Sequence, residues 1–91
     1  MNTISLNELK KISNPIIIDI RDNYSYSISH IKNSINIPYY NLLNNFSHYL
    51  NKNNIYYLYC EEGKQSLEIS KRLNEFGYNT KSIKGGLNAL K

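Results

Sequence analysis

Residues 55–76, IYYLYCEEGKQSLEISKRLNEF, contain the pattern that decides the fold. An apolar run rich in aromatic residues ends at Cys60, a short loop with one glycine follows, and the next segment has apolar residues at helical spacing. This order predicts a strand, a loop that begins with cysteine, and a helix. In parallel α/β sheets, such a loop lies beyond the carboxyl ends of the strands, where ligands bind.

Cys60 is the residue of this stretch with the clearest chemistry. A helix that begins just after the loop brings its partly positive end near the sulfur, and loop N–H groups that point inward favour an anion or a thiolate there. A thiolate is the nucleophilic form of cysteine, so Cys60 is a candidate nucleophile. The strand, loop and helix order alone leaves an alternative open, in which Cys60 is a small buried hydrophobic residue at a strand end.

The composition is that of one small globular domain. The chain has 91 residues, of which 41% are hydrophobic and 20% charged, so we expect a single domain over residues 1–91. No window approaches the length of a membrane span, and the first residues lack the pattern of a signal peptide. We therefore expect a cytoplasmic protein with no membrane partner.

The numbers of cysteine and histidine residues limit the chemistry further. A single cysteine cannot form an internal disulfide, and two histidines and one cysteine at distant positions do not supply a metal site. We therefore expect neither a metal nor a cofactor. The net charge of +4 raises the question of nucleic acid, but the lysines are spread along the chain without interleaved aromatic residues. We interpret the charge as a solvated surface and expect no nucleic-acid partner.

Strands and helices are expected to alternate along the chain. Capping-box residues predict a short helix over residues 5–12, and apolar spacing predicts helices over residues 39–50 and after the Cys60 loop, the last one capped by Gly77. Apolar runs predict strands at residues 15–20, 34–38, 55–60 and 79–83. In the first helix, Leu6, Leu9 and Ile12 are expected on or near one face. The apolar positions of the two later helices are expected in the core: Leu42, Leu43, Phe46, Tyr49, Leu50, Ile69, Leu73 and Phe76. This alternation predicts a parallel sheet with right-handed crossovers.

Two segments between the strands have weaker signals. Residues 23–29 are weakly helical at best. Asn33 lies between His30-Ile31 and the expected strand at residues 34–38. Asparagine tolerates the left-handed conformation. A tight turn is therefore expected at Asn33.

Five polar or small residues outside the loop are candidates for the support of a site. Asp19 and Arg21 lie at the carboxyl end of an expected central strand, and we interpret them as an ion pair or loop clamp. His30 precedes an apolar residue and is interpreted as structural, with a general base as the alternative. Gly85 and Gly86 follow the last strand, where paired glycines permit close backbone approach, and the expected topology places them beside the Cys60 loop.

Four short motifs follow one another along the chain. They are Ile18-Asp19-Ile20-Arg21; Tyr26 with Ser29-His30-Ile31, Ser34 and Ile35-Asn36-Ile37-Pro38; Cys60-Glu61-Glu62-Gly63-Lys64-Gln65-Ser66; and Gly85-Gly86-Leu87-Asn88-Ala89. In this order and spacing, over residues 16–90, the chain resembles single-domain rhodaneses. The resemblance implies an α/β, rhodanese-like fold with a small parallel sheet of about four to five strands and helices on both faces.

The same resemblance implies a sulfurtransferase. Cys60 takes a sulfane sulfur from thiosulfate or a persulfide, holds it as a persulfide, and passes it to a thiol, cyanide or an acceptor protein. The donor is then a small sulfur compound or a persulfidated protein. The implied substrate-binding loop consists of Glu61, Glu62, Gly63, Lys64, Gln65 and Ser66. Its amides agree with the role, since successive N–H groups form a nest for an anion.

Three positions depart from the family pattern. Gln65 stands where many rhodaneses have arginine, Ser29 where they have glycine, and Leu90 where they often have tryptophan. Glu61 and Glu62 add negative charge to the loop, and Lys64 is the only cation expected to oppose them. We therefore expect thiosulfate to be a poorer donor than for relatives with a basic loop, and a persulfide to be a better one.

Two other functions compete with this interpretation. A rhodanese-like domain that has lost turnover serves as a binding or regulatory module. A phosphatase or arsenate reductase uses a cysteine in a similar cradle, but it needs a longer loop and a closing arginine for bidentate recognition of the oxyanion. Gln65 occupies the position of that arginine, which makes this class the weaker alternative.

Overall fold

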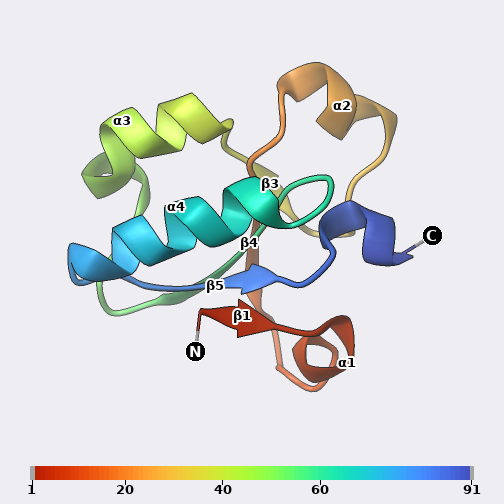
Figure 1. Ribbon diagram of the computed structural model, residues 1–91, viewed down its shortest axis with the longest axis horizontal. Coiled ribbons are helices and arrows are strands. Elements are labelled where there is room, and N and C mark those ends of the chain that lie inside the picture. Colours follow the sequence, from red (N-terminus) through yellow and green to blue (C-terminus); the bar gives the residue numbers. More distant parts are fainter. Residues whose placement is uncertain (1, 91) are drawn as a thin grey trace.

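A computed structural model describes residues 2–90 of the chain and shows a parallel sheet of five strands (Figure 1). The strands are β1 (Thr3–Ile4), β2 (Ile16–Asp19), β3 (Ile35–Asn36), β4 (Ile55–Tyr59) and β5 (Asn79–Ile83). Their order across the sheet is β1-β5-β4-β2-β3, and every pairing is parallel. The expected α/β fold with a small parallel sheet is confirmed.

Helices cover both faces of the sheet. They are α1 (Leu6–Leu9), α2 (Asn23–Ile28), α3 (Tyr39–Tyr49), α4 (Lys64–Glu75) and the 3₁₀ turn η1 (Gly86–Leu90). In Figure 1, α3 and α4 lie above the strands and α1 lies below them. Two buried clusters match this arrangement, since Leu42 and Leu73 pack in one, and Leu9 and Leu87 in the other.

The alternation of side chains along β2 and β4 decides which face receives the cysteine. Leu58 belongs to the cluster under α3 and α4, whereas Tyr57 and Tyr59 belong to the cluster under α1 and η1. Cys60 directly follows β4 and continues the two-residue period, so it packs with Leu58. The sulfur therefore lies on the α4 side of the sheet, at the carboxyl end of a central strand.

The first residues differ from the sequence-based expectation in two ways. The capping box forms, with Ser5 Oγ accepting from the Glu8 amide at 3.1 Å and Glu8 Oε1 accepting from the Ser5 amide at 2.9 Å. However, α1 ends at Leu9, and the amides of Lys11 and Ile12 bond three residues back instead of four. The strand β1 was not predicted, since two residues carry little local signal and pair only with the distant β5.

The middle of the chain also differs in detail. Residues 23–28 form a true helix, because Asp22 caps it by accepting from the Ser25 amide at 2.8 Å. Asn33 has φ +70°, which agrees with the expected turn.

The end of α4 differs in one side chain. Gly77 has φ +93° and follows the helix as predicted. The expectation that Tyr49 of α3 is a core residue is wrong, because it is 39% exposed. The same expectation for Phe76 is also wrong. Its ring is 51% exposed and stacks on Phe46 at the edge of the core, with ring centroids 5.1 Å apart.

The described helices also bear on the question of a membrane. Among residues 2–90, no helix is both long enough and apolar enough to cross one.

Candidate active site

The Cys60 loop owes its shape to Gly63. This residue is the N-cap of α4 and has φ +99°, a conformation that side chains disfavour. A Cβ at this position would lie 3.1 Å from the amide nitrogen of Gly85, so the close approach of the second glycine loop also requires a glycine here. Because Gly63 offers no capping side chain, the first amides of α4, at Lys64 and Gln65, keep their donors available.

The sulfur of Cys60 lies on backbone donors. The amides of Gly63 and Ser66 donate to Sγ at 3.1 and 3.4 Å. Both donors lie at the start of α4, a helix of 12 residues whose partly positive end faces the sulfur. Cys60 is also buried, with 4% of its surface exposed. Cys60 is thus a buried core residue whose sulfur also faces two backbone amides at the start of α4.

Buried hydroxyl groups connect the sulfur to the last strand. Sγ lies 3.5 Å from Ser66 Oγ, which in turn lies 2.6 Å from Ser82 Oγ on β5. Ser66 Oγ also donates to the carbonyl of Gly63 at 3.2 Å. Ser66 and Ser82 are both almost fully buried. Ser66 was expected in the loop, but the structure ends the loop at Gly63 and places Lys64, Gln65 and Ser66 in the first turn of α4. Ser82 was not expected at all, because a serine in a strand carries no local signal of its partner.

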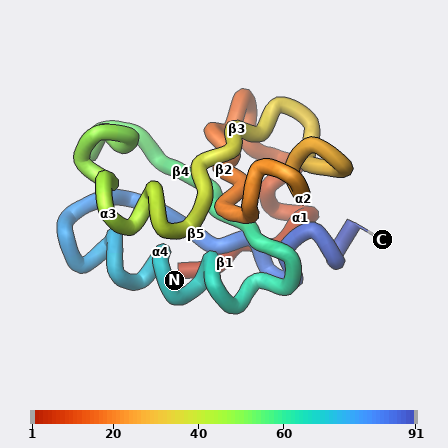
Figure 2. The backbone as a smooth tube through the Cα atoms, turned by 90° about the horizontal axis from the view of Figure 1, so that it is seen from above, coloured from red at the N-terminus to blue at the C-terminus, as the bar shows by residue number. Residues whose placement is uncertain are grey.

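The turn η1 holds the outer side of the loop. The amides of Leu87 and Asn88 donate to the carbonyls of Cys60 and Glu61 at 2.9 and 3.0 Å. In a planar trans peptide the C=O and N–H groups point in opposite directions, so fixing these two carbonyls turns the following amides away from η1. The expected position of Gly85 and Gly86 beside the loop is confirmed, and Figure 2 shows the blue end of the chain next to the loop that enters α4.

Arg21 clamps three parts of the structure together. Its Nε and Nη2 donate to the Asp19 carboxylate at 2.8 to 3.1 Å, its Nη2 also donates to the carbonyl of Ser29, and its Nη1 donates to Glu61 Oε2 at 3.1 Å. The Arg21 side chain is 8% exposed and that of Asp19 is fully buried. The hydrogen bonds that Arg21 donates to Asp19, opposed by burial, raise the pKa of Arg21. The expected ion pair of Asp19 and Arg21 is confirmed.

The ion pair of Arg21 with Glu61 corrects one expectation. Lys64 is not the only cation that opposes the two loop glutamates, because the guanidinium of Arg21 lies 3.1 Å from the carboxylate of Glu61. Sequence analysis missed this pair because its members are forty positions apart and belong to different elements. Asp19 already neutralises Arg21, however, so the charges at the loop still include an excess of carboxylates.

His30 and Tyr59 support the segment that follows α2. The ring of His30 stacks on Tyr26 at 3.8 Å, and its Nδ1 lies 2.7 Å from the Tyr26 carbonyl oxygen. Tyr59 is buried, accepts from the Ile31 amide at 2.9 Å and lies 3.2 Å from Ser34 Oγ. Burial raises the pKa of Tyr59 to about 12, so its hydroxyl stays protonated. The sequence analysis did not identify Tyr59, because a tyrosine in a strand reads as an ordinary core residue.

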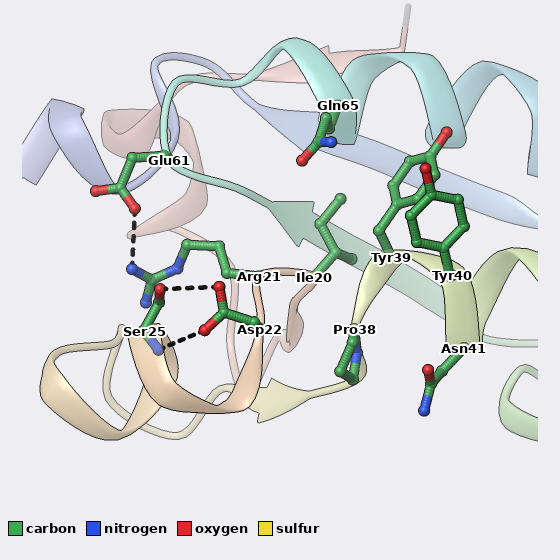
Figure 3. A pocket seen from close by; sticks show the side chains of 10 residues that line it. All are labelled: Ile20, Arg21, Asp22, Ser25, Pro38, Tyr39, Tyr40, Asn41, Glu61 and Gln65. Carbon is green, nitrogen blue, oxygen red and sulfur yellow. Dashed lines mark hydrogen bonds and ion pairs between the residues drawn. The ribbon is translucent and has the colours of Figure 1, made fainter.

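A hollow of about 380 Å³ opens beside the loop, as Figure 3 shows. Its walls come from the end of β2, the start of α2, the start of α3 and the Cys60 loop. The lining residues are Ile20, Arg21, Asp22, Ser25, Pro38, Tyr39, Tyr40, Asn41, Glu61 and Gln65. Most of them were not candidates from the sequence, because only the fold brings these four segments together. Among the described residues, no group of three or more metal-binding side chains occurs.

Comparisons with known proteins agree with this geometry. The family model for the rhodanese-like domain matches residues 4–91. The chain is 39% identical over 84 residues to an adenylyltransferase and sulfurtransferase, UBA4, of Debaryomyces hansenii, covering 82% of this chain and 19% of that protein. It is 35% identical over 94 residues to a probable molybdopterin-synthase adenylyltransferase of Pyropia yezoensis, covering 97% of this chain and 25% of that protein. The chain thus spans a quarter or less of the length of these relatives.

Solved structures share the fold over the whole chain. A rhodanese-like domain protein from Staphylococcus aureus superposes with a TM-score of 0.88 and is 27% identical, covering 100% of this chain and 92% of that one. The strand order, the cysteine-led loop and the family match lead to one conclusion: the chain belongs to the rhodanese-like domain family.

Proposed function

We propose that this protein is a sulfurtransferase that carries a sulfane sulfur as a persulfide on Cys60. The observation that carries the proposal is the position of Sγ, which accepts two backbone amides at the start of α4. A sulfur held by amide donors is stabilised as an anion, and the same donors can stabilise a terminal persulfide sulfur. The family membership and the sulfurtransferase among the relatives support the same chemistry.

The first half-reaction transfers sulfur to the protein. The thiolate of Cys60, whose proton has passed to solvent, attacks the sulfane sulfur of the donor. With thiosulfate, a bond forms between Sγ and that sulfur while the sulfur–sulfur bond of thiosulfate breaks, and sulfite leaves with the bonding electron pair. The terminal sulfur of the new persulfide carries the negative charge. The amides of Gly63 and Ser66, together with the first amides of α4, bind this charge.

The second half-reaction returns Cys60 to its starting state. An acceptor thiolate attacks the terminal sulfur, a new sulfur–sulfur bond forms on the acceptor, and the bond to Sγ breaks with its electron pair remaining on Cys60. Cyanide as acceptor yields thiocyanate by the same path. We place this exchange in the cytoplasm, where thiols remain reduced.

The charges around the loop disfavour a dianionic donor. Arg21 compensates Glu61, but Arg21 is also neutralised by Asp19. Glu62 follows Glu61 in the chain, and Lys64 is the first residue of α4. These five groups comprise three carboxylates and two cations. We therefore propose a persulfide, on a protein or a small molecule, as the better donor, with thiosulfate as the poorer one.

Mass spectrometry of the intact protein tests the proposal. After incubation with a panel of sulfane donors, we expect a gain of one sulfur atom, because Cys60 is the only cysteine of the chain. The gain should disappear in Cys60→Ser, which keeps the size of the side chain but not its nucleophilicity. It should also be reversed by a thiol acceptor. Absence of any gain with every donor would favour the alternative of a binding module without turnover.

The donor preference is tested by a change of loop charge. We expect the triple variant Glu61→Gln, Glu62→Gln and Gln65→Arg to load sulfur from thiosulfate about tenfold faster, since opposite charges near 4 Å interact by roughly 1 kcal/mol even in water. Loss of Glu61 also frees Nη1 of Arg21 for the donor. Glu75→Gln on α4 is the control for a change of charge away from the loop. An unchanged or slower rate in the triple variant contradicts the charge argument.

A phosphatase remains the second enzymatic candidate from the sequence, and Gln65 argues against it. Gln65 lines the hollow beside the loop where a bidentate cation would be needed for a phosphate ester. Turnover of nitrophenyl phosphate that depends on Cys60 would favour the phosphatase over the sulfurtransferase.

A further inference from the structure

The hollow beside the loop has two chemically distinct ends. In Figure 3, Tyr39 and Tyr40 lie at one end, and Arg21, Asp22 and Glu61 lie at the other. Tyr40 is 70% exposed, so its ring is available to a partner and contributes little to the core. Tyrosine is enriched at protein interfaces because it offers a large contact area and a polar tip at low entropic cost.

A second hollow, of about 310 Å³, lies against the first. It is lined by Arg21, Tyr24, Ser25, Ile28, Ser29, Glu61 and Leu87, three of which also line the first hollow. Tyr24 and Ile28 project from α2 and are 75% and 67% exposed, and α2 has no buried residue at all. Tyr24, Ile28 and Tyr40 are thus three of the most exposed large hydrophobic side chains of the described chain, and they line the two hollows beside the Cys60 loop. The residues that line these two hollows are called the rim below.

The charges of this rim are negative. Asp22 accepts from the amide and hydroxyl of Ser25, and these hydrogen bonds lower the pKa of Asp22, so the carboxylate is ionised at neutral pH. Glu61 adds a second carboxylate. Arg21 is the one cation among the residues that line the two hollows, and most of its donors are occupied by Asp19, Ser29 and Glu61. A small anion therefore finds no uncompensated positive side chain here.

The chain as a whole has the opposite charge. Its net charge is +4, so the rim is an acidic and aromatic region on a basic protein. An acidic region favours a basic partner, and steering of this kind raises the rate of encounter at low ionic strength. Aromatic rings beside the carboxylates add cation–π attraction for lysine or arginine.

We propose that Tyr24, Ile28, Tyr40, Asp22 and Glu61 form a docking surface for a protein partner in sulfur transfer, which presents a cysteine flanked by basic residues. The proposal rests on the proposed function and names its partner by chemistry: a polypeptide thiol or persulfide with lysine or arginine beside it. The carboxylates contact the basic side chains, the tyrosines contact the peptide, and the cysteine reaches the loop between the two hollows.

A binding experiment tests the surface without any sulfur chemistry. Two acetylated and amidated peptides, Lys-Gly-Cys-Gly-Lys and Glu-Gly-Cys-Gly-Glu, are titrated into ¹⁵N-labelled Cys60→Ser protein under reducing conditions. We expect the basic peptide to bind about fivefold more tightly at low salt, with shifts at the amides of residues 22, 25 and 40 and a smaller preference at high salt. Equal binding of the two peptides, or shifts centred elsewhere, would overturn the proposal. Tighter binding of a single-stranded RNA oligonucleotide at these residues would also overturn it.

Matched variants separate the surface from general effects. Asp22→Asn removes the charge but keeps a good helix cap, and Tyr40→Ala removes an exposed ring, so neither should unfold the protein. Both should reduce the preference for the basic peptide at least about twofold. Glu75→Gln on α4 also removes a carboxylate charge, and Tyr49→Ala at the far end of α3 also removes a tyrosine ring. Both should leave the preference for the basic peptide unchanged. Equal effects of the two pairs would contradict the proposal.

A transfer experiment distinguishes this proposal from the proposed function. Wild-type protein is incubated with donors, and transfer of sulfur to each peptide thiol is followed by mass spectrometry. Failure of Cys60 to gain sulfur would overturn the proposed function, while the peptide titration would still decide on the surface. Gain of sulfur with equal transfer to both peptides would overturn the docking surface and leave the carrier function in place.

Discussion

Gly86→Ala is expected to lower the rate of sulfur loading on Cys60 by at least about tenfold, because the loop loses the backbone contact that orients it. A Cβ on residue 86 would lie 2.2 Å from the carbonyl oxygen of Cys60 and 2.7 Å from that of Glu61. These are backbone atoms that cannot rotate away. The loop or η1 must therefore move, and the hydrogen bonds from Leu87 and Asn88 to the same carbonyls break. Loading kinetics by intact mass measure the effect.

Gly77→Ala is the matched control for this prediction. Gly77 also has a positive φ, of +93°, but a Cβ there meets only the flexible end of the Lys52 side chain at 3.4 Å or more. The variant pays the backbone strain of about 1–2 kcal/mol without touching the Cys60 loop. We expect it to lower the thermal midpoint while it loads sulfur at the wild-type rate. Loading by Gly86→Ala at that same rate would show that η1 does not orient the loop.

Arg21→Gln is expected to lower the free energy of unfolding by about 3 kcal/mol, the usual cost of removing one member of a buried ion pair. The carboxylate of Asp19 is fully buried and would keep the backbone N–H of residue 21 at 2.8 Å, but it would lose the guanidinium. For a domain of this size, the melting temperature should fall by at least about 10 °C. Thermal and chemical denaturation measure both quantities.

Two further variants locate the cause of that loss. Arg72→Gln alters the other arginine of the chain, which is exposed on α4, and should change stability by less than about 0.5 kcal/mol. Adding Asp19→Asn to Arg21→Gln removes the buried charge, so the double variant should be more stable than Arg21→Gln alone. If the second substitution lowers stability further, an unpaired carboxylate is not the source of the effect.

Local patterns were sufficient to predict the parts of the site that lie close together in the chain. The apolar run of β4, the glycine of the loop and the periodic residues of α4 all signal their conformations within a few positions. They therefore placed Cys60 at the carboxyl end of a strand and at the start of a helix. The buried pair of Asp19 and Arg21 was also accessible, because its members are two residues apart.

Features that depend on distant partners were not predictable in the same way. Glu61 pairs with Arg21, which lies forty positions earlier in the chain. Ser82 is connected to the sulfur only through the hydroxyl of Ser66, and β1 forms only by pairing with the edge of β5. Phe76 has the spacing of a core residue, yet the helix ends beside it and its ring remains at the surface. Tertiary packing decides these pairings and the burial of these side chains, and it overrides the local preference of the sequence.

The pairing of β1 with β5 joins the two ends of the described chain. Thr3 and Ile4 lie beside Ser82 and Ile83, and Lys84 donates to the Ile4 carbonyl at 2.9 Å, directly before the glycines that orient the Cys60 loop. Contacts between such distant positions form late in folding, because the entropy of closing the intervening chain must first be overcome. We therefore expect a nascent or partly folded chain to expose its thiol without the oriented amides. We therefore expect the chain to become able to transfer sulfur only when the fold is complete and β5 has paired with β1.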